Sequence, residues 1–172
     1  MSKVIRWGIL GASKFAREQM GPAIHGARGA QLAALATSSP DKAQGFAAYV
    51  PDLRVHDSYD ALLSDPDIDA VYIPLPNHLH VEWSKRALNA GKHVLCEKPI
   101  AMQASDIDDL IALRDKTGLH IAEAYMIVHH PQWQRTRELV QSGAIGKLMH
   151  VEGTFAYNNA ADPENVRQKP EL

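Results

Sequence analysis

Lys98 stands in the tripeptide Glu97-Lys98-Pro99, directly after an apolar run that predicts a buried strand over residues 92–97. A lysine amine at the carboxyl end of such a strand can be partly removed from water. Partial burial lowers its pKa towards neutrality, and the amine can then exchange a proton with a substrate hydroxyl. A lysine taken alone is more often a solvated surface charge. The choice between these interpretations depends on what the other elements place beside the tripeptide.

The first apolar run, residues 4–10, is too continuously apolar for a strand with one wet face and predicts a central parallel strand. Gly11 then permits a sharp turn. A helix starting near Ser13 would direct its first amides and its positive dipole end back at that turn, where a pyrophosphate can bind. The dinucleotide fingerprint is imperfect, because Ser13 replaces the second glycine and Ala16 takes the third position, so an ordinary strand-to-helix turn is the alternative. The residues that we assign here to cofactor binding are Gly11, Ala12, Ser13, Lys14 and Phe15.

The second predicted strand, residues 31–37, ends in Thr37-Ser38-Ser39-Pro40-Asp41-Lys42. In a Rossmann unit, a carboxylate at this tip binds the adenosine ribose diol, whereas a 2′-phosphate needs hydrogen-bond donors or positive charge. The tip carries no carboxylate, so we assign Thr37 and Ser38 to cofactor binding and favour NADP over NAD, with NAD still possible. The alternative is a Ser/Pro turn that begins a helix over residues 41–49.

A further buried strand is predicted over residues 69–74, and the residues that follow it form a stiff, proline-rich lip, Pro74 to His80. Ligands of α/β folds bind at this end of the strands. The cofactor contacts that we predict in the lip are Pro74, Leu75, Asn77 and His80. We assign no metal to His78 and His80, because this pair lacks nearby cysteine or carboxylate partners.

Strand and helix patterns alternate six times up to Glu123, which predicts an α/β fold with a Rossmann-type, doubly wound parallel sheet. The predicted strands cover residues 4–10, 31–37, 54–56, 69–74, 92–97 and 119–123, and the predicted helices cover 13–25, 41–49, 58–63 and 78–89, with a fifth helix opening at Ser105. In that fifth helix we expect a capping box from Ser105 to Asp108 and a buried stripe of Ile107, Leu110 and Ile111.

After Glu123 the pattern changes to a helix over residues 131–141 and a strand over 148–157 with one polar face. The apolar face of that strand consists of Met149, Val151, Phe155 and Tyr157. A strand with one wet face belongs to an antiparallel type of sheet. We therefore expect a Rossmann domain over residues 1–123, and over 124–172 the start of a second α/β domain with a mainly antiparallel open sheet.

The composition excludes several classes of protein. The formal net charge is −2, with acidic and basic residues interspersed, which gives no footprint for nucleic acid or an anionic membrane. No apolar run approaches the roughly 20 residues needed to cross a bilayer, and the first strand carries Lys3 and Arg6, unlike a signal peptide. Cys96, the single cysteine, has no partner within the chain, so we expect a reducing cytoplasm.

Four stretches together resemble the Gfo/Idh/MocA oxidoreductases, the family of glucose-fructose oxidoreductase and inositol dehydrogenase. They are R-W-G-I-L-G-A-S-K-F-A, D-A-V-Y-I-P-L-P-N-H-L-H, G-K-H-V-L-C-E-K-P-I-A-M, and H-P-Q with S-G-A-I-G-K-L after it. The tripeptide after G-K-H-V-L-C is far more specific than the glycine turn. The closing D-P-E-N-V-R-Q-K-P-E-L resembles the branch of D-xylose dehydrogenases and dimeric dihydrodiol dehydrogenases.

The resemblance implies an enzyme that transfers a hydride between NADP or NAD and a hydroxyl of a small-molecule sugar, polyol or diol. It makes Lys98 the catalytic residue for the proton, places Glu97 and Lys98 at the cofactor, and implies a cis Lys98-Pro99 bond. It also implies a homo-oligomer formed through the second domain's sheet. Family members usually continue past the position of Leu172 into a segment with a further Asp and His. We therefore expect this chain alone to lack turnover, and a catalytically incomplete nucleotide-binding or regulatory module is the alternative.

Overall fold

The computed structural model describes residues 3–156 and residue 158. Its backbone divides into two compact units, Met1–Ala124 and Tyr125–Leu172. The closing segment 162–172, on which the resemblance to one branch of the family rests, lies outside the described residues. No helix in the described part of the chain is long and apolar enough to cross a membrane.

The first unit is built on a six-stranded sheet, and each pair of neighbouring strands is parallel, which confirms the predicted fold class. Its strands are β1 (Ile5–Leu10), β2 (Ala30–Ala36), β3 (Arg54–His56), β4 (Ala70–Ile73), β5 (His93–Glu97) and β6 (Ile121–Ala124). Their spatial order is β3-β2-β1-β4-β5-β6. The chain therefore reverses its direction of progress between β1 and β4, and in such sheets ligands bind beyond the carboxyl ends of the strands at that point.

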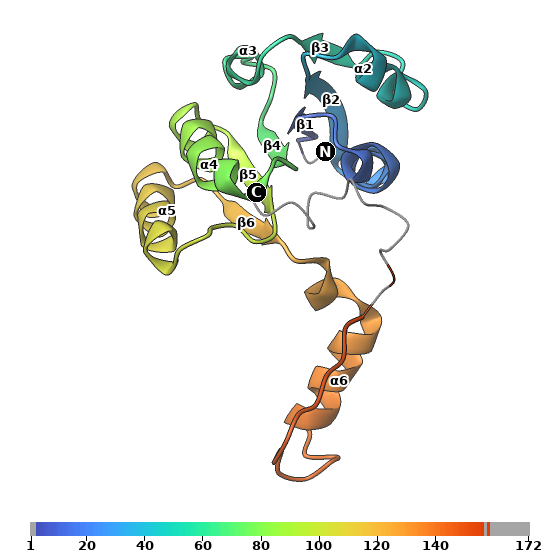
Figure 1. Ribbon diagram of the computed structural model, residues 1–172, viewed down its shortest axis with the longest axis vertical. Coiled ribbons are helices and arrows are strands. Elements are labelled where there is room, and N and C mark those ends of the chain that lie inside the picture. Colours follow the sequence, from blue (N-terminus) through green and yellow to red (C-terminus); the bar gives the residue numbers. More distant parts are fainter. Residues whose placement is uncertain (1–2, 157, 159–172) are drawn as a thin grey trace. The chain divides into compact units, whose positions relative to one another are not determined.

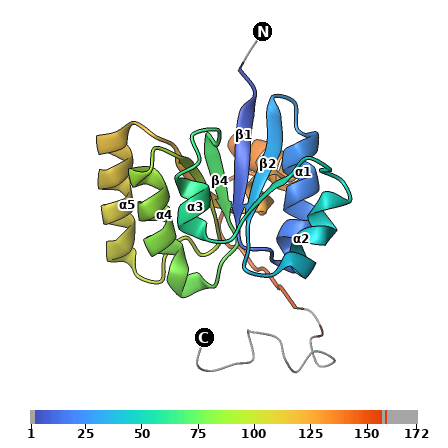
Figure 2. The same ribbon diagram turned by 90° about the horizontal axis from the view of Figure 1, so that it is seen from above.

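Helices cover both faces of this sheet (Figures 1 and 2), because its central strands are apolar on both sides. On one face lie the π-helical segment η1 (Ala16–Met20), α1 (Gly21–Gly26) and α2 (Pro40–Ala47), and on the other lie α3 (Tyr59–Leu63), α4 (His80–Asn89) and α5 (Ala104–Thr117). Each face has its own core. Phe46 of α2 and Tyr72 of β4 are fully buried in one, and Leu62 of α3 and Val71 of β4 in the other.

The start and the apolar stripe of α5 differ from the prediction. The helix begins after Gln103, and no side chain caps it, so Ser105 lies within the first turn and the capping box does not form. Leu110 is buried, but Ile107 and Ile111 are each 40% exposed. The reason is that α5 packs beside α4, so that only one row of its side chains reaches the core.

The second unit contains a short 3-10 helix, η3 (Met126–His129), and α6 (Pro131–Gln141), whose bounds are those predicted from the sequence. His130 caps α6 by accepting a hydrogen bond on Nδ1 from the amide of Gln132, at 3.2 Å. Residues 148–156 form no strand, so that prediction is wrong for them, and Tyr157 lies outside the described residues. A strand needs a neighbour that exchanges hydrogen bonds with it, and no other described segment of this unit supplies one.

Candidate cofactor and active site

The turn after β1 and the lip after β4 pack against each other at the carboxyl edge of the sheet. Gly11 has a φ of +99°, a conformation that only glycine adopts readily. A Cβ added there would lie 2.9 Å from Leu75 Cδ2, so a larger residue would press on the lip as well. The amide of Gly11 donates to the carbonyl of Ala36 at 2.9 Å, which ties the turn to the end of β2.

Ser13, which replaces the second glycine of the fingerprint, caps the helix that follows. Its Oγ accepts a hydrogen bond from the amide of Ala16 at 3.1 Å, and its carbonyl accepts one from Arg17 at 3.0 Å. The hydroxyl thus orders the helix start. Lys14 and Phe15 are exposed in this first turn, where backbone amides lack partners within the helix and an anion is favoured.

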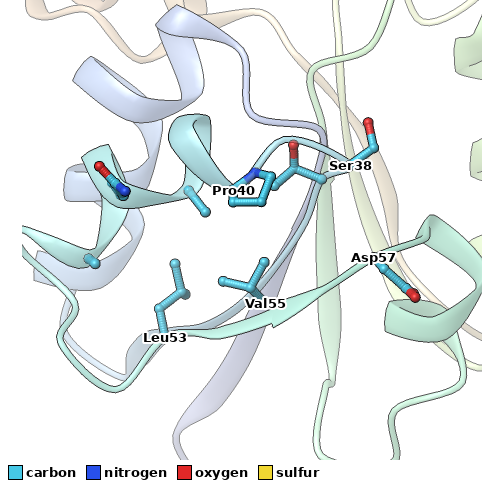
Figure 3. A pocket seen from close by; sticks show the side chains of 9 residues that line it. Ser38, Pro40, Leu53, Val55 and Asp57 are labelled. Carbon is cyan, nitrogen blue, oxygen red and sulfur yellow. The ribbon is translucent and has the colours of Figure 1, made fainter.

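The tip of β2 is fastened to the end of β3, because the amide of Thr37 donates to the carbonyl of His56 at 3.0 Å. Beside this junction lies a hollow of about 470 Å³, shown in Figure 3. Its lining residues are Thr37, Ser38, Pro40, Ala43, Gln44, Ala47, Leu53, Val55 and Asp57. Asp57, which was not predicted as a site residue, adds a carboxylate to the lining of this hollow.

His80 lies beneath the lip and is unavailable to a cofactor. Its side chain has no exposed surface, and its Nε2 and Nδ1 lie 2.7 Å from the carbonyl oxygens of Leu75 and Pro99. The predicted direct contact between this ring and a cofactor is therefore wrong, because both nitrogens are already engaged. Pro74 and Leu75 are half-buried in the lip, and Asn77 is exposed.

The turn that carries Lys98 follows β5, and its Lys98-Pro99 peptide bond is cis, as the resemblance implied. The amide of Lys98 donates to Glu97 Oε2 at 3.2 Å, and the buried Tyr72 hydroxyl donates to Glu97 Oε1 at 2.7 Å. Burial, with the neighbouring Glu97 carboxylate, raises the pKa of Tyr72. The amide of Ile100 donates to Glu123 Oε1 at 2.9 Å. These bonds fix the backbone on both sides of the lysine.

The Lys98 side chain is exposed, contrary to the partial burial expected from the sequence. The difference arises because the lysine stands on a turn beyond the strand end, whereas Cys96 inside the strand is fully buried. Burial raises the pKa of the Cys96 thiol to about 12, so this cysteine is protonated and unreactive at neutral pH. Within the described residues, no group of three or more His, Cys, Asp or Glu side chains could hold a metal ion.

The family model of the Gfo/Idh/MocA proteins, an oxidoreductase family with an NAD-binding Rossmann fold, matches residues 5–125. The chain belongs to this family. An uncharacterised oxidoreductase of Rhizobium meliloti is 45% identical over 163 residues, which are 95% of this chain and 48% of the relative. A dTDP-3,4-didehydro-2,6-dideoxy-alpha-D-glucose 3-reductase of Saccharopolyspora spinosa is 40% identical over 172 residues, 100% of this chain and 51% of the relative. The chain thus spans about half the length of these relatives.

Among solved structures, the chain is similar to KijD10, a 3-ketoreductase from Actinomadura kijaniata in complex with NADP and TDP-benzene. The TM-score is 0.76 and the identity 37%, over 83% of this chain and 44% of that one. The similarity covers more than the Rossmann fold in general, because the sequence identity is well above the level at which only folds are shared.

Proposed function

We propose that this chain carries the cofactor site and the catalytic lysine of an NAD(P)-dependent oxidoreductase acting on a sugar, polyol or diol. One observation supports the proposal: the Gly11 turn adjoins the lip after β4, and His80 joins that lip to the Lys98 turn, at the edge where the order of the strands reverses. The family membership and the names of the relatives support it.

The residues at this edge fit a nicotinamide dinucleotide. We assign the pyrophosphate to the helix start over residues 11–15, the adenosine ribose to Thr37 and Ser38, and the nicotinamide half to Pro74, Leu75 and Asn77. The fit rests on the positive φ of Gly11, which brings backbone to the edge without a side chain, and on the open first turn after Ser13. The cofactor, when bound, supplies the hydride acceptor or donor.

Lys98 handles the proton. When the substrate is oxidised, a hydride leaves the carbon with both electrons of its C–H bond, and the hydroxyl proton passes to the side-chain nitrogen of Lys98 as the C=O bond forms. In reduction the ammonium returns that proton to the carbonyl oxygen. The hydrogen bonds of Glu97 and Glu123 to the flanking amides hold the backbone of the lysine, so that the side chain starts from a fixed point.

The proton role is tested by Lys98→Met in the natural full-length protein, with Lys116→Met at the end of α5 as a matched loss of charge away from the site. Lost acid-base catalysis should lower kcat by about 10²–10⁴-fold and leave cofactor affinity nearly unchanged. A Lys98→Met enzyme with normal kcat would exclude the role. A parent protein that binds the cofactor and turns over no sugar or diol would favour a regulatory nucleotide-binding module instead.

For the cofactor we infer a preference for NADP, supported by the absence of a carboxylate in Thr37-Ser38-Ser39. Asp57 opposes this preference, because its negative charge repels a 2′-phosphate. Titration of the tryptophan fluorescence with both cofactors tests the inference. We expect Ser38→Asp to shift the preference towards NAD, and Asp57→Asn to tighten NADP severalfold with little effect on NAD. Tighter binding of NAD by the parent chain would overturn the preference.

The proposal extends to the cellular compartment and the oligomeric state of the protein. A reducing cytoplasm is supported by the single cysteine, and a homo-oligomer formed through the second domain's sheet is supported by the family resemblance. Sedimentation analysis of the natural protein should give a mass that is a multiple of its chain mass. A monomer over the working range of concentrations would exclude the oligomer.

A further inference from the structure

One buried side chain joins the lip after β4 to the lysine turn after β5. His80, the first residue of α4, places its Nε2 2.7 Å from the Leu75 carbonyl and its Nδ1 2.7 Å from the Pro99 carbonyl. A neutral imidazole donates to one of these carbonyls and an imidazolium to both. Burying a polar ring is costly unless it is hydrogen-bonded, so these two contacts account for its place in the folded protein.

Leu75 faces the glycine turn with its side chain while its carbonyl faces His80. The space between them is small, because a Cβ built on Gly11 would lie 2.9 Å from Leu75 Cδ2. Prolines on both sides of Leu75 restrict the backbone of the lip, so the positions of its side chain and of its carbonyl are coupled. A series of neighbouring groups therefore runs from the Gly11 turn to Leu75, through the two hydrogen-bond contacts of His80 to Pro99, and so to Lys98.

The other anchors of the lysine turn connect it to the sheet. Glu97, held by Tyr72 of β4, accepts from the Lys98 amide, and Glu123 of β6 accepts from the Ile100 amide. These carboxylates belong to β5 and β6, which are hydrogen-bonded neighbours in the sheet. His80 instead connects the turn to a loop that borders the proposed pyrophosphate site.

We propose that His80 is a positioning residue, which transmits occupancy of the glycine turn to the backbone of Lys98. The inference rests on the proposed function, because it takes the Gly11 turn as the pyrophosphate site and Lys98 as the catalytic residue. A pyrophosphate at the turn restrains Leu75, and His80 passes this restraint to Pro99. The lysine is thereby held more firmly when the cofactor is present than when it is absent.

The test uses 2′-phospho-ADP, which carries the adenosine and pyrophosphate of NADP but no nicotinamide and so cannot reach Lys98 directly. Hydrogen exchange of the Lys98 and Ile100 amides is followed by NMR in the 172-residue chain, with and without saturating ligand. In the parent chain we expect the ligand to slow both amides about fivefold or more, the lower end of typical coupling between sites.

The variants separate transmission from folding. His80→Leu should abolish the slowing even at saturating ligand, and His80→Gln, which keeps one donor, should restore part of it. Ser84→Ala is the matched control, because Ser84 is equally buried one turn later in α4 and makes no hydrogen bond to the lip or the lysine turn among the described residues. Leu75→Ala breaks the preceding contact and should also reduce the slowing, which keeps the test decisive if His80→Leu does not fold.

Three results would overturn one or the other of these claims. A parent chain that binds 2′-phospho-ADP without slowing these amides, or a His80→Leu chain that keeps the slowing, would overturn the role of His80 and leave the proposed function standing. A parent chain that does not bind the ligand would overturn the proposed cofactor site itself, and with it the basis for transmission.

Discussion

Removing the Tyr72 hydroxyl should measurably loosen the structure around Lys98. Tyr72 is fully buried, and its hydroxyl lies 2.7 Å from Glu97 Oε1, so Tyr72→Phe deletes a hydrogen bond to a carboxylate while keeping the ring. Hydrogen bonds to charged groups contribute about 1.5–3 kcal/mol. Glu97 is half-buried, and water can replace part of the bond, so we expect the free energy of unfolding to fall by about 1.5 kcal/mol. For a chain of this size the melting temperature would fall by about 3–6 °C.

Urea unfolding at pH 7, followed by far-ultraviolet circular dichroism, measures this loss. Tyr59→Phe is the matched control, since Tyr59 is a half-buried tyrosine whose hydroxyl makes no hydrogen bond to a described residue. In a Glu97→Ala background, Tyr72→Phe should cost much less, because the acceptor is already gone. Equal losses in both backgrounds, or no loss in the parent, would refute the view that this bond holds the lysine turn.

Three further changes test other parts of the structure. Hydrogen bonds from Arg6 hold the pKa of Asp69 well below its usual range, so the stability that the Asp69 carboxylate contributes is present above about pH 4 and is lost as the pH falls below it. The urea midpoint of Asp69→Asn should therefore depend less on pH in this acid range than the midpoint of the parent chain. Burial raises the pKa of Tyr49 to about 12, above its ordinary value of 10.0, so stability should fall as pH rises between these values, and Tyr49→Phe should flatten that fall in a thermal melt. Gly11→Ala, at a φ of +99° and 2.9 Å from Leu75 Cδ2, should destabilise by about 1–2 kcal/mol and weaken NADP at least about tenfold, as measured by melting and titration.

The parallel sheet was predictable because most of its strands are short apolar runs separated by helices, and several end at Gly, Pro or Ser signals that stop them. The absence of a strand over residues 148–156 could not be predicted. Alternation of apolar and polar residues along 148–157 shows which side chains would share a face, but it does not show whether a neighbouring strand is present to pair with. The exposure of Ile107 and Ile111 was missed for a related reason. Helical spacing shows that these residues share a side, but the packing of α5 against α4 decides how much of that side is covered.

Some features of the candidate site could likewise be predicted from the sequence, and others could not. The positions of Gly11 and Lys98 follow from local patterns, a glycine after a strand and a specific tripeptide at a strand end. Tyr72 and Glu123 hold the lysine turn through pairings set by the register of β4, β5 and β6, which a single sequence does not contain. The predicted role of His80 was wrong because a histidine at a helix start suggests a ligand contact. Only the fold shows the two carbonyl oxygens that contact its ring.

The central claim is that a nicotinamide dinucleotide binds across the turns that follow β1, β2, β4 and β5. Titrating the isotope-labelled 172-residue chain with NADP and mapping the changes in backbone amide chemical shift tests it directly. We predict that the largest changes fall in residues 11–15, 37–39, 75–77 and 98–100, which form one edge of the sheet. Changes centred instead on the opposite edge, around Asp67 and Lys92, would contradict the account.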